Sequence, residues 1–330
     1  MPRLRQGRLR VGGTRQAGDV MQEIWRGGVN AWECDEMGHL NVRFYVQRAI
    51  EGVMAMAPAL ALGQAFRSGA AATLIPRDQH IRFLREARPG APLHMIGGVV
   101  EMGETDAVLY QELRHADGTP AATFRTVLDH VDAKSGRPFA WSQRTRDAAD
   151  GWRVVIPPHG ASRSVDLQRA PDPMIDRAVA EGLGLSCIGR GAVTHAECDG
   201  FGRARPEIFI GRVSDSVPNL MADWRAEVAR TASAADGVAR EAGAAVLEYR
   251  LIYRAWPRAG DLIEVWSGFT SANEKTQALA HWLLDPVTGA PWCTCEAVAI
   301  TLDLIARKAI PTPPEHLAAL RARLVPGLTI

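Results

Sequence analysis

Two stretches of the sequence, 164 positions apart, share the pattern Glu-Cys-Asp-x-x-Gly, at residues 33–38 and at residues 197–202. Three further matches follow in the same order: residues 81–83 with 251–253, 118–120 with 289–291, and 131–132 with 302–303. Matches that keep their order over about 100 residues indicate a tandem duplication. The chain is therefore expected to fold as two similar units, which constrains its architecture more than any other feature.

Each copy predicts the same series of elements. A short apolar segment leads into the shared turn, and in the first copy apolar residues then recur at helical spacing from Val42 to Ala57, before Pro58. Four strand-like runs follow in each copy: residues 79–84, 93–102, 107–114 and 121–131, and residues 246–253, 262–270, 276–284 and 293–303. One long helix followed by antiparallel strands can bury its apolar stripe only against that sheet, so each unit is predicted to be α+β.

The length of 330 residues agrees with two domains. We expect unit 1 to span residues 21–142 and unit 2 to span residues 188–310. Residues 143–187, which are punctuated by proline and include a short helical pattern, are predicted to form a surface linker. Residues 1–20 are rich in arginine and are expected to form a flexible tail. Residues 311–330 are expected to hold a C-terminal helix and tail.

Composition excludes several classes of function. The 38 basic and 37 acidic residues nearly cancel, so no nucleic-acid partner is expected. The longest apolar stretch is short and contains Pro58, so no membrane span is expected. The five cysteines do not suggest a disulfide framework, and their odd number, with no secretory signal, predicts a cytoplasmic location. Cys293 and Cys295 alternate as in a strand, so neither a metal nor a cofactor is expected.

The candidate chemistry lies in the first turn, from Asp35 to Tyr45. Asp35 precedes the expected helix, so its carboxylate can cap the helix or face a cleft. Gly38 lets a substrate oxygen approach the backbone, and the helix N-terminus offers N–H donors to an oxyanion. His39 and Asn41 flank this end, and Tyr45 shares a helix face with Asn41. These groups suit the addition of water to an activated carbonyl, although a plain helix start uses similar residues.

The pattern Asp-x-x-Gly-His-x-Asn-x-x-x-Tyr resembles the signature of the hotdog-fold thioesterases. The likeness is to the 4-hydroxybenzoyl-CoA and acyl-CoA thioesterase branch and to its acyl-ACP thioesterase relatives. It covers residues 22–142 and 188–307. It implies a tandem double hotdog, in which each unit is a long helix wrapped by a curved antiparallel sheet, with acyl-thioester sites between the units.

The resemblance also implies roles for the motif residues. Asp35 would be the general base for water or the nucleophile, and the Gly38 amide would polarise the thioester carbonyl. His39 and Asn41 would position water or substrate, and Tyr45 would contact the substrate. The implied substrate is an acyl-CoA or an acyl carrier protein thioester, with no cofactor, and a homodimer is expected by analogy. Many relatives have a second Asn directly after the first, where this chain has Val42. The sequence does not identify the acyl chain or distinguish CoA from acyl carrier protein as its carrier.

The second copy departs from this pattern. Asp199 and Gly202 persist, but the positions of His39, Asn41, Val42 and Tyr45 are taken by Arg203, Arg205, Pro206 and Phe209. An ion pair of Arg203 with Asp199 would weaken this carboxylate as a base. We therefore expect one competent site, centred on Asp35, with the second site, at Asp199 and Arg203, reduced to a scaffold or to substrate contact. Side chains of unit 2 should reach that site, and Glu248 and Glu274 are unranked candidates.

The sequence is also compatible with two other functions. Hotdog hydratases and dehydratases also pair Asp with His, although with a spacing one residue longer than that of Asp35 and His39 and with a Pro before the His. The second alternative is a non-catalytic sensor of acyl thioesters. Such regulators usually carry a DNA-binding module, but residues 1–20 are too few to form a helix-turn-helix. A thiol-release assay over a panel of acyl-CoA chain lengths separates all three.

Overall fold

The computed structural model describes residues 21–232, 242–303 and 305–330, with side chains from residue 221 to residue 243 left out. The expectation of a flexible tail at residues 1–20 therefore lies outside the described residues. Among these residues no helix is long and apolar enough to cross a membrane.

Unit 1 begins with one strand and a short 3-10 helix, continues with a long helix, and ends with four strands. These elements are β1 (Gln22–Gly28), η1 (Ala31–Glu33), α1 (Val42–Met56), β2 (Ala72–Phe83), β3 (Pro92–Met102), β4 (Asp106–His115) and β5 (Pro120–Asp132). The strands lie in the order β1-β3-β4-β5-β2, and every neighbouring pair is antiparallel.

Unit 2 repeats this series. Its elements are β6 (Ser186–Ala192), η3 (His195–Glu197), α4 (Pro206–Ala232), β7 (Ala242–Tyr253), β8 (Leu262–Ala272), β9 (Gln277–Leu284) and β10 (Pro291–Asp303), followed by β11 (Lys308–Ile310) and α5 (Pro314–Arg321). The strands lie in the order β7-β10-β9-β8-β6, and β11 pairs with β10.

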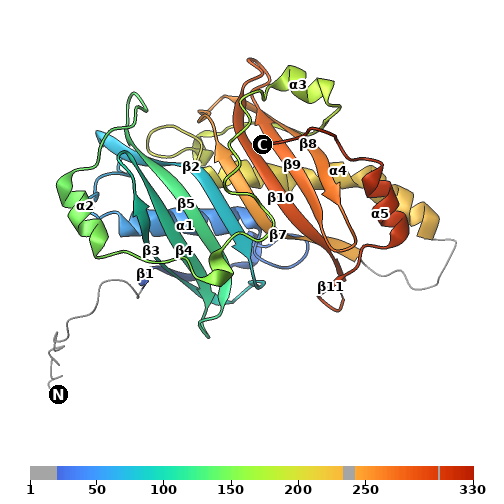
Figure 1. Ribbon diagram of the computed structural model, residues 1–330, viewed down its shortest axis with the longest axis horizontal. Helices are drawn as coiled ribbons and strands as arrows, with labels where there is room; N and C mark the ends of the chain where they lie inside the picture. Colours follow the sequence, from blue (N-terminus) through green and yellow to red (C-terminus); the bar gives the residue numbers. More distant parts are fainter. Residues whose placement is uncertain (1–20, 233–241, 304) are drawn as a thin grey trace.

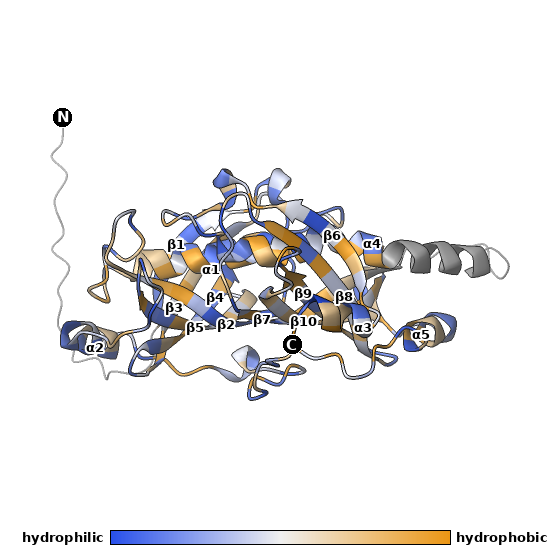
Figure 2. Ribbon diagram, turned by 90° about the horizontal axis from the view of Figure 1, so that it is seen from above, coloured by the Kyte–Doolittle hydropathy of each residue, from blue (hydrophilic) through white to orange (hydrophobic). Residues whose placement is uncertain are grey.

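The two units share one continuous sheet. β2 pairs with β7 in antiparallel register, with Asp78 opposite Ile252 and Arg82 opposite Glu248. Figures 1 and 2 show the sheet curving around α1 and α4, which contact each other on its concave side. The predicted fold class, an α+β tandem double hotdog with each helix wrapped by an antiparallel sheet, is confirmed.

The sequence pattern of α1 explains its position. The Asn41 side chain accepts a hydrogen bond from the Arg43 N–H at 2.9 Å and so caps the helix. The predicted stripe packs into the core, where Val46, Ala49 and Val53 are buried. The helix ends at Met56, two residues before the proline that the pattern marked as its stop.

Strand β2 begins seven residues earlier than the alternating pattern predicts. Pro76 lies inside it, and the register with β5 shifts between Pro76 and Asp78. Proline cannot donate to a ladder and is accommodated at such a bulge, which also breaks the alternation. The alternating pattern therefore did not predict the early part of β2.

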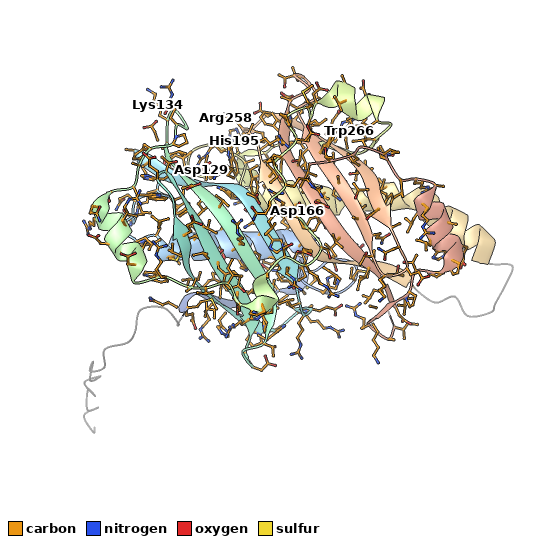
Figure 3. All side chains as sticks on the ribbon, viewed as in Figure 1. Asp129, Lys134, Asp166, His195, Arg258 and Trp266 are labelled. Atoms are coloured by element: carbon orange, nitrogen blue, oxygen red, sulfur yellow. The ribbon has the colours of Figure 1, made fainter. Side chains whose placement is uncertain are left out.

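The segment between the units crosses the convex face of the sheet, opposite the two central helices (Figure 2). It contains α2 (Gln143–Asp150), a 3-10 turn η2 (Pro158–Gly160) and α3 (Arg177–Gly182), so the expected helical stretch at Met174–Ala180 begins three residues later. Arg250 of β7 donates to the carbonyl of Asp166, which Figure 3 labels in front of the sheet between the two halves. The crossover is thus bound directly to the junction of the units.

Glu248 is a second anchor of this crossover. Its carboxylate is almost fully buried and accepts hydrogen bonds from the N–H groups of Arg163, at 3.0 Å, and Ser164, at 2.8 Å. The side chain of His80 lies 2.7 Å away across the β2–β7 junction. Burial by itself would raise the pKa of Glu248, but the His80 hydrogen bond and these N–H donors outweigh burial and lower the pKa to about 2.

This buried carboxylate predicts a loss of stability in acid. A lowered pKa stabilises the fold fully above the ordinary pKa of a glutamate, and the stabilisation is lost as the pH falls towards the folded value. We expect the free energy of unfolding to fall by about 2 kcal/mol between about pH 5 and about pH 3 because of Glu248. Denaturant unfolding over this pH range measures the fall. If a Glu248→Gln variant showed the same pH dependence of the unfolding free energy as the wild type, the prediction would be wrong.

Candidate active site

The turn that carries the motif is anchored to α1 behind it. Glu33 is buried, forms a capping box with Asn30, and is paired with the Arg48 side chain of α1. The loop then closes on itself, since the Asp35 N–H donates to the His39 carbonyl at 3.0 Å. In unit 2 the equivalent Glu197 pairs with Arg212 at 2.8 Å. The glutamate of the repeated motif therefore has a structural role in both copies.

Asp35 and His39 lie together on the wall of a cavity. Oδ2 of Asp35 lies 3.1 Å from Nδ1 of His39, and Oδ1 accepts from the Met37 N–H at 3.0 Å. Both side chains are about four-fifths buried, with 18% and 20% exposed. Burial disfavours the protonated imidazole, but the hydrogen bond and negative charge of Asp35 outweigh it and raise the pKa of His39.

The first N–H of α1 is available to a ligand. The N–H groups of Arg43 and Phe44 donate to the side chain and the carbonyl of Asn41, both at 2.9 Å. The N–H of Val42 donates to no acceptor among the described residues, and Val42 lines the same cavity as Asp35. A free N–H at a helix N-terminus, where the helix dipole adds positive potential, is suited to an oxyanion.

Two expectations need correction. The N–H of Gly38 donates to the Asp35 carbonyl at 3.0 Å, because the turn with φ +75° at Gly38 folds back on that group. It is therefore occupied and does not point to a role in polarising a substrate. Asn41 caps α1 and donates through Nδ2 to Ser214 of α4 at 3.1 Å, so it joins the two helices instead of lining the cavity.

The cavity lies between the two units and measures about 1000 Å³. Unit 1 contributes Asp35, His39, Val42 and Tyr45, whose ring meets Phe83 of β2 edge to face at 5.0 Å. Unit 2 contributes α4, β7, β9 and β10 to the wall. This volume suits a ligand of drug size or larger.

Unit 2 reaches the motif through residues that the sequence did not single out. Arg307, after β10, donates through Nη1 to the Met37 carbonyl at 3.2 Å and through Nη2 to Glu86 at 2.9 Å. It therefore holds the loop between Asp35 and His39. Glu248 anchors the crossover instead, and neither it nor Glu274 lines the cavity. No local pattern marks Arg307, because its partners are more than 200 positions away.

In unit 2, the position equivalent to Asp35 is occupied by an ion pair. Arg203 donates through Nε and Nη2 to Oδ2 of Asp199, at 3.0 and 2.8 Å, while Oδ1 accepts from two N–H groups. Pro206 takes the position of Val42 and has no N–H to offer. Asp199 and Arg203 line a separate cavity of about 250 Å³. The expected ion pair is present, and neither residue lies at the Asp35 cavity.

Comparison with known proteins agrees with this geometry. Residues 29–149 match the family model of the thioesterase-like superfamily. This matched segment contains the whole Asp35 motif, and the resemblance predicted from the sequence is confirmed for it. The sequence matches none of the curated proteins. Among the described residues no cluster of His, Cys, Asp and Glu could hold a metal ion.

Solved structures of similar fold cover almost the whole chain. A structure described as a putative oleoyl thioesterase from Lactobacillus plantarum has a TM-score of 0.64 at 12% identity, and the match covers 88% of this chain and 98% of that one. The 12:0-ACP thioesterase from Umbellularia californica has a TM-score of 0.60 at 10% identity, over 84% and 93% of the chains. An acyl-ACP thioesterase from Bacteroides thetaiotaomicron has a TM-score of 0.57 at 11% identity, over 83% and 96%. At these identities the likeness shows the shared double-hotdog fold.

Proposed function

We propose that the protein hydrolyses acyl thioesters at one site per chain, centred on Asp35. The observation that carries the proposal is a carboxylate and an unoccupied helix N-terminal N–H on the wall of one cavity between the units. Thioester hydrolysis needs both groups, one to activate or replace water and one to stabilise the oxyanion. The family match of residues 29–149 and the fold of acyl-ACP and oleoyl thioesterases support the same reaction.

The proposed reaction begins with the thioester carbonyl near the Val42 N–H. Asp35 then acts in one of two ways, either taking a proton from water that attacks the carbonyl carbon or attacking that carbon itself. In both cases a carbon–oxygen bond forms, the carbon–sulfur bond breaks, and the thiolate takes up a proton. After direct attack, water then hydrolyses the mixed anhydride between the acyl group and Asp35, which releases the acid and restores the carboxylate. Net addition of one water gives a carboxylic acid and a free thiol. His39, hydrogen-bonded to Oδ2, orients the Asp35 carboxylate.

Release of free thiol tests the reaction. The substrates are acyl-CoA thioesters over a range of chain lengths and the same acyl groups on an acyl carrier protein. We expect the protein to hydrolyse at least one of them to thiol and acid. The two carriers in parallel identify the one that the protein uses. Addition of water to an enoyl thioester without thiol release would instead indicate a hydratase. Binding of acyl thioesters without any turnover would indicate a sensor.

The equivalent carboxylate of unit 2 should be dispensable for turnover. In Asp199→Asn we expect a kcat close to that of the wild type, because Asp199 lies outside the Asp35 cavity and is neutralised by Arg203. The partly exposed ion pair contributes at most about 1 kcal/mol to stability. Steady-state thiol release and thermal unfolding measure both effects. A loss of turnover as large as that of an Asp35 variant, in a folded protein, would show that the two sites are equivalent.

A further inference from the structure

The cavity wall is divided by charge. Apart from Arg307, its charged residues come from three segments of unit 1, at residues 35–39, 85–88 and 115–117. Of the lining residues that the structure describes in unit 2, Arg307 alone is charged, and it is paired with the unit 1 loops. The rest of the unit 2 wall, including residues 244–247 of β7, is uncharged. An acyl thioester with its reacting carbonyl at Asp35 would therefore place its acyl chain in unit 2.

One polar side chain in this uncharged part has an oxygen that lacks a partner. Gln277, the first residue of β9, lines the cavity and is only 7% exposed. Its Oε1 is fully buried and accepts no hydrogen bond among the described residues. A buried acceptor without a donor costs about 1–3 kcal/mol, so natural proteins seldom keep one without a reason.

Gln277 differs from other buried groups that lack a partner. Gln111 also has an unpartnered Oε1, but its Nε2 donates to the Ala49 carbonyl at 2.9 Å, and it does not line the cavity. His115 and Arg307 each have one unpartnered nitrogen and line the cavity, but they belong to its charged end and are less buried. In the uncharged part of the described wall, Gln277 is the side chain with a buried oxygen that has no partner.

The sheet register places Gln277 away from the reacting end. It lies opposite Ala299 of β10, which in turn lies opposite Val246 of β7. β9 is three strands from β2, whose Phe83 lines the Asp35 end of the cavity, and three strand spacings amount to roughly 14 Å. A ligand group that meets Gln277 is therefore well removed from the thioester.

We propose that Gln277 is a specificity-determining residue, which hydrogen-bonds an uncharged oxygen substituent, a hydroxyl or a keto group, on the acyl chain. The proposal rests on the proposed thioester hydrolysis. An amide can donate to a keto oxygen and can both donate to and accept from a hydroxyl. Among the described residues, this uncharged part of the wall offers no cation for a carboxylate, so we expect the substituent to be neutral. An unsubstituted chain would leave the buried Oε1 unpaired and would bind less well.

The test compares acyl-CoA thioesters of one chain length, unsubstituted or with one hydroxyl at successive positions from the middle of the chain to its end. The wild type should prefer one positional isomer over the unsubstituted chain by at least about tenfold in kcat/KM. Gln277→Leu should lose that preference and hydrolyse the unsubstituted chain at least as well as the wild type. Its melting temperature should not fall, because leucine removes an unpaired buried polar group.

Several results would overturn this role. They are a wild type without preference at any position, a Gln277→Leu protein that keeps the preference, or a variant that is clearly less stable, which would mean that the amide has a structural partner. Gln277→Met serves as a second apolar variant of similar length. Binding of the matched free acids to Asp35→Asn, measured by calorimetry, separates the two proposals because it needs no turnover. If the free acids bind with a preference that depends on Gln277 but the wild type hydrolyses no thioester, the proposed reaction is wrong. If the substituted and unsubstituted acids bind equally and the wild type hydrolyses thioesters normally, the role of Gln277 is wrong.

Discussion

Asp35→Asn should lower kcat for thioester hydrolysis by about 10²–10⁴-fold while the protein stays folded. The substitution removes the charge that is proposed to take a proton from water or to attack the carbonyl, but it keeps the shape of the side chain. The Oδ1 that accepts from the Met37 N–H is retained, and the side chain is not fully buried. Free energy of unfolding should therefore change by less than about 1 kcal/mol. Thiol release under saturating substrate, together with denaturant unfolding, measures the two quantities.

The matched control for this variant is Asp199→Asn, which makes the same change at the equivalent position of unit 2. Its turnover should remain near that of the wild type. Near-normal hydrolysis of every acyl thioester by Asp35→Asn would remove the proposed mechanism. Loss of structure, seen as a lower unfolding free energy, would call for Asp35→Ser as a second variant, for which the same loss of kcat is expected.

Val42→Pro should lower kcat by about 10²–10³-fold, because it deletes the N–H that would stabilise the oxyanion. Proline is well tolerated at the first position of a helix, where the N–H has no helical partner. Asn41, the preceding residue, already has φ −65° and ψ 141°, which are the angles that a following proline requires. The chain itself has Pro206 at the equivalent position of α4. The fold should therefore survive the substitution.

Val42→Ala is the control, since it shortens the same side chain but keeps the N–H. Its kcat should stay close to that of the wild type. Full activity of a folded Val42→Pro protein would show that another group stabilises the oxyanion. An equal loss in Val42→Ala would show that the side chain, and not the amide, is what matters. Circular dichroism before the kinetic measurements verifies that α1 is intact in both proteins.

Local signals were enough to predict several parts of the structure. The start of α1 at Val42 follows from the Asn41 cap and the apolar stripe, both of which lie within a few residues of one another. The ion pair of Arg203 with Asp199, four positions apart in one turn, is equally local. The early part of β2 was missed because Pro76 and its bulge interrupt the alternation on which the prediction relied.

Other parts of the candidate site could not be predicted in this way. The choice between the Gly38 and Val42 amides depends on how the turn closes, and the sequence permits either. Arg307 and Gln277 lie in unit 2, far along the chain from Asp35, and neither belongs to a recognisable motif. They were missed for this reason.

The amino-acid sequence is enough to establish that the chain is duplicated, that each copy is a helix followed by antiparallel strands, and that the complete motif occurs in the first copy alone. These properties depend on short-range patterns that each stretch of chain carries with it. The folded arrangement was needed to show that Arg307 and Gln277 line the Asp35 cavity and that the Val42 N–H has no acceptor among the described residues. Those outcomes depend on the pairing of β2 with β7 and on the packing of α1 against α4, which bring together residues that no local pattern relates.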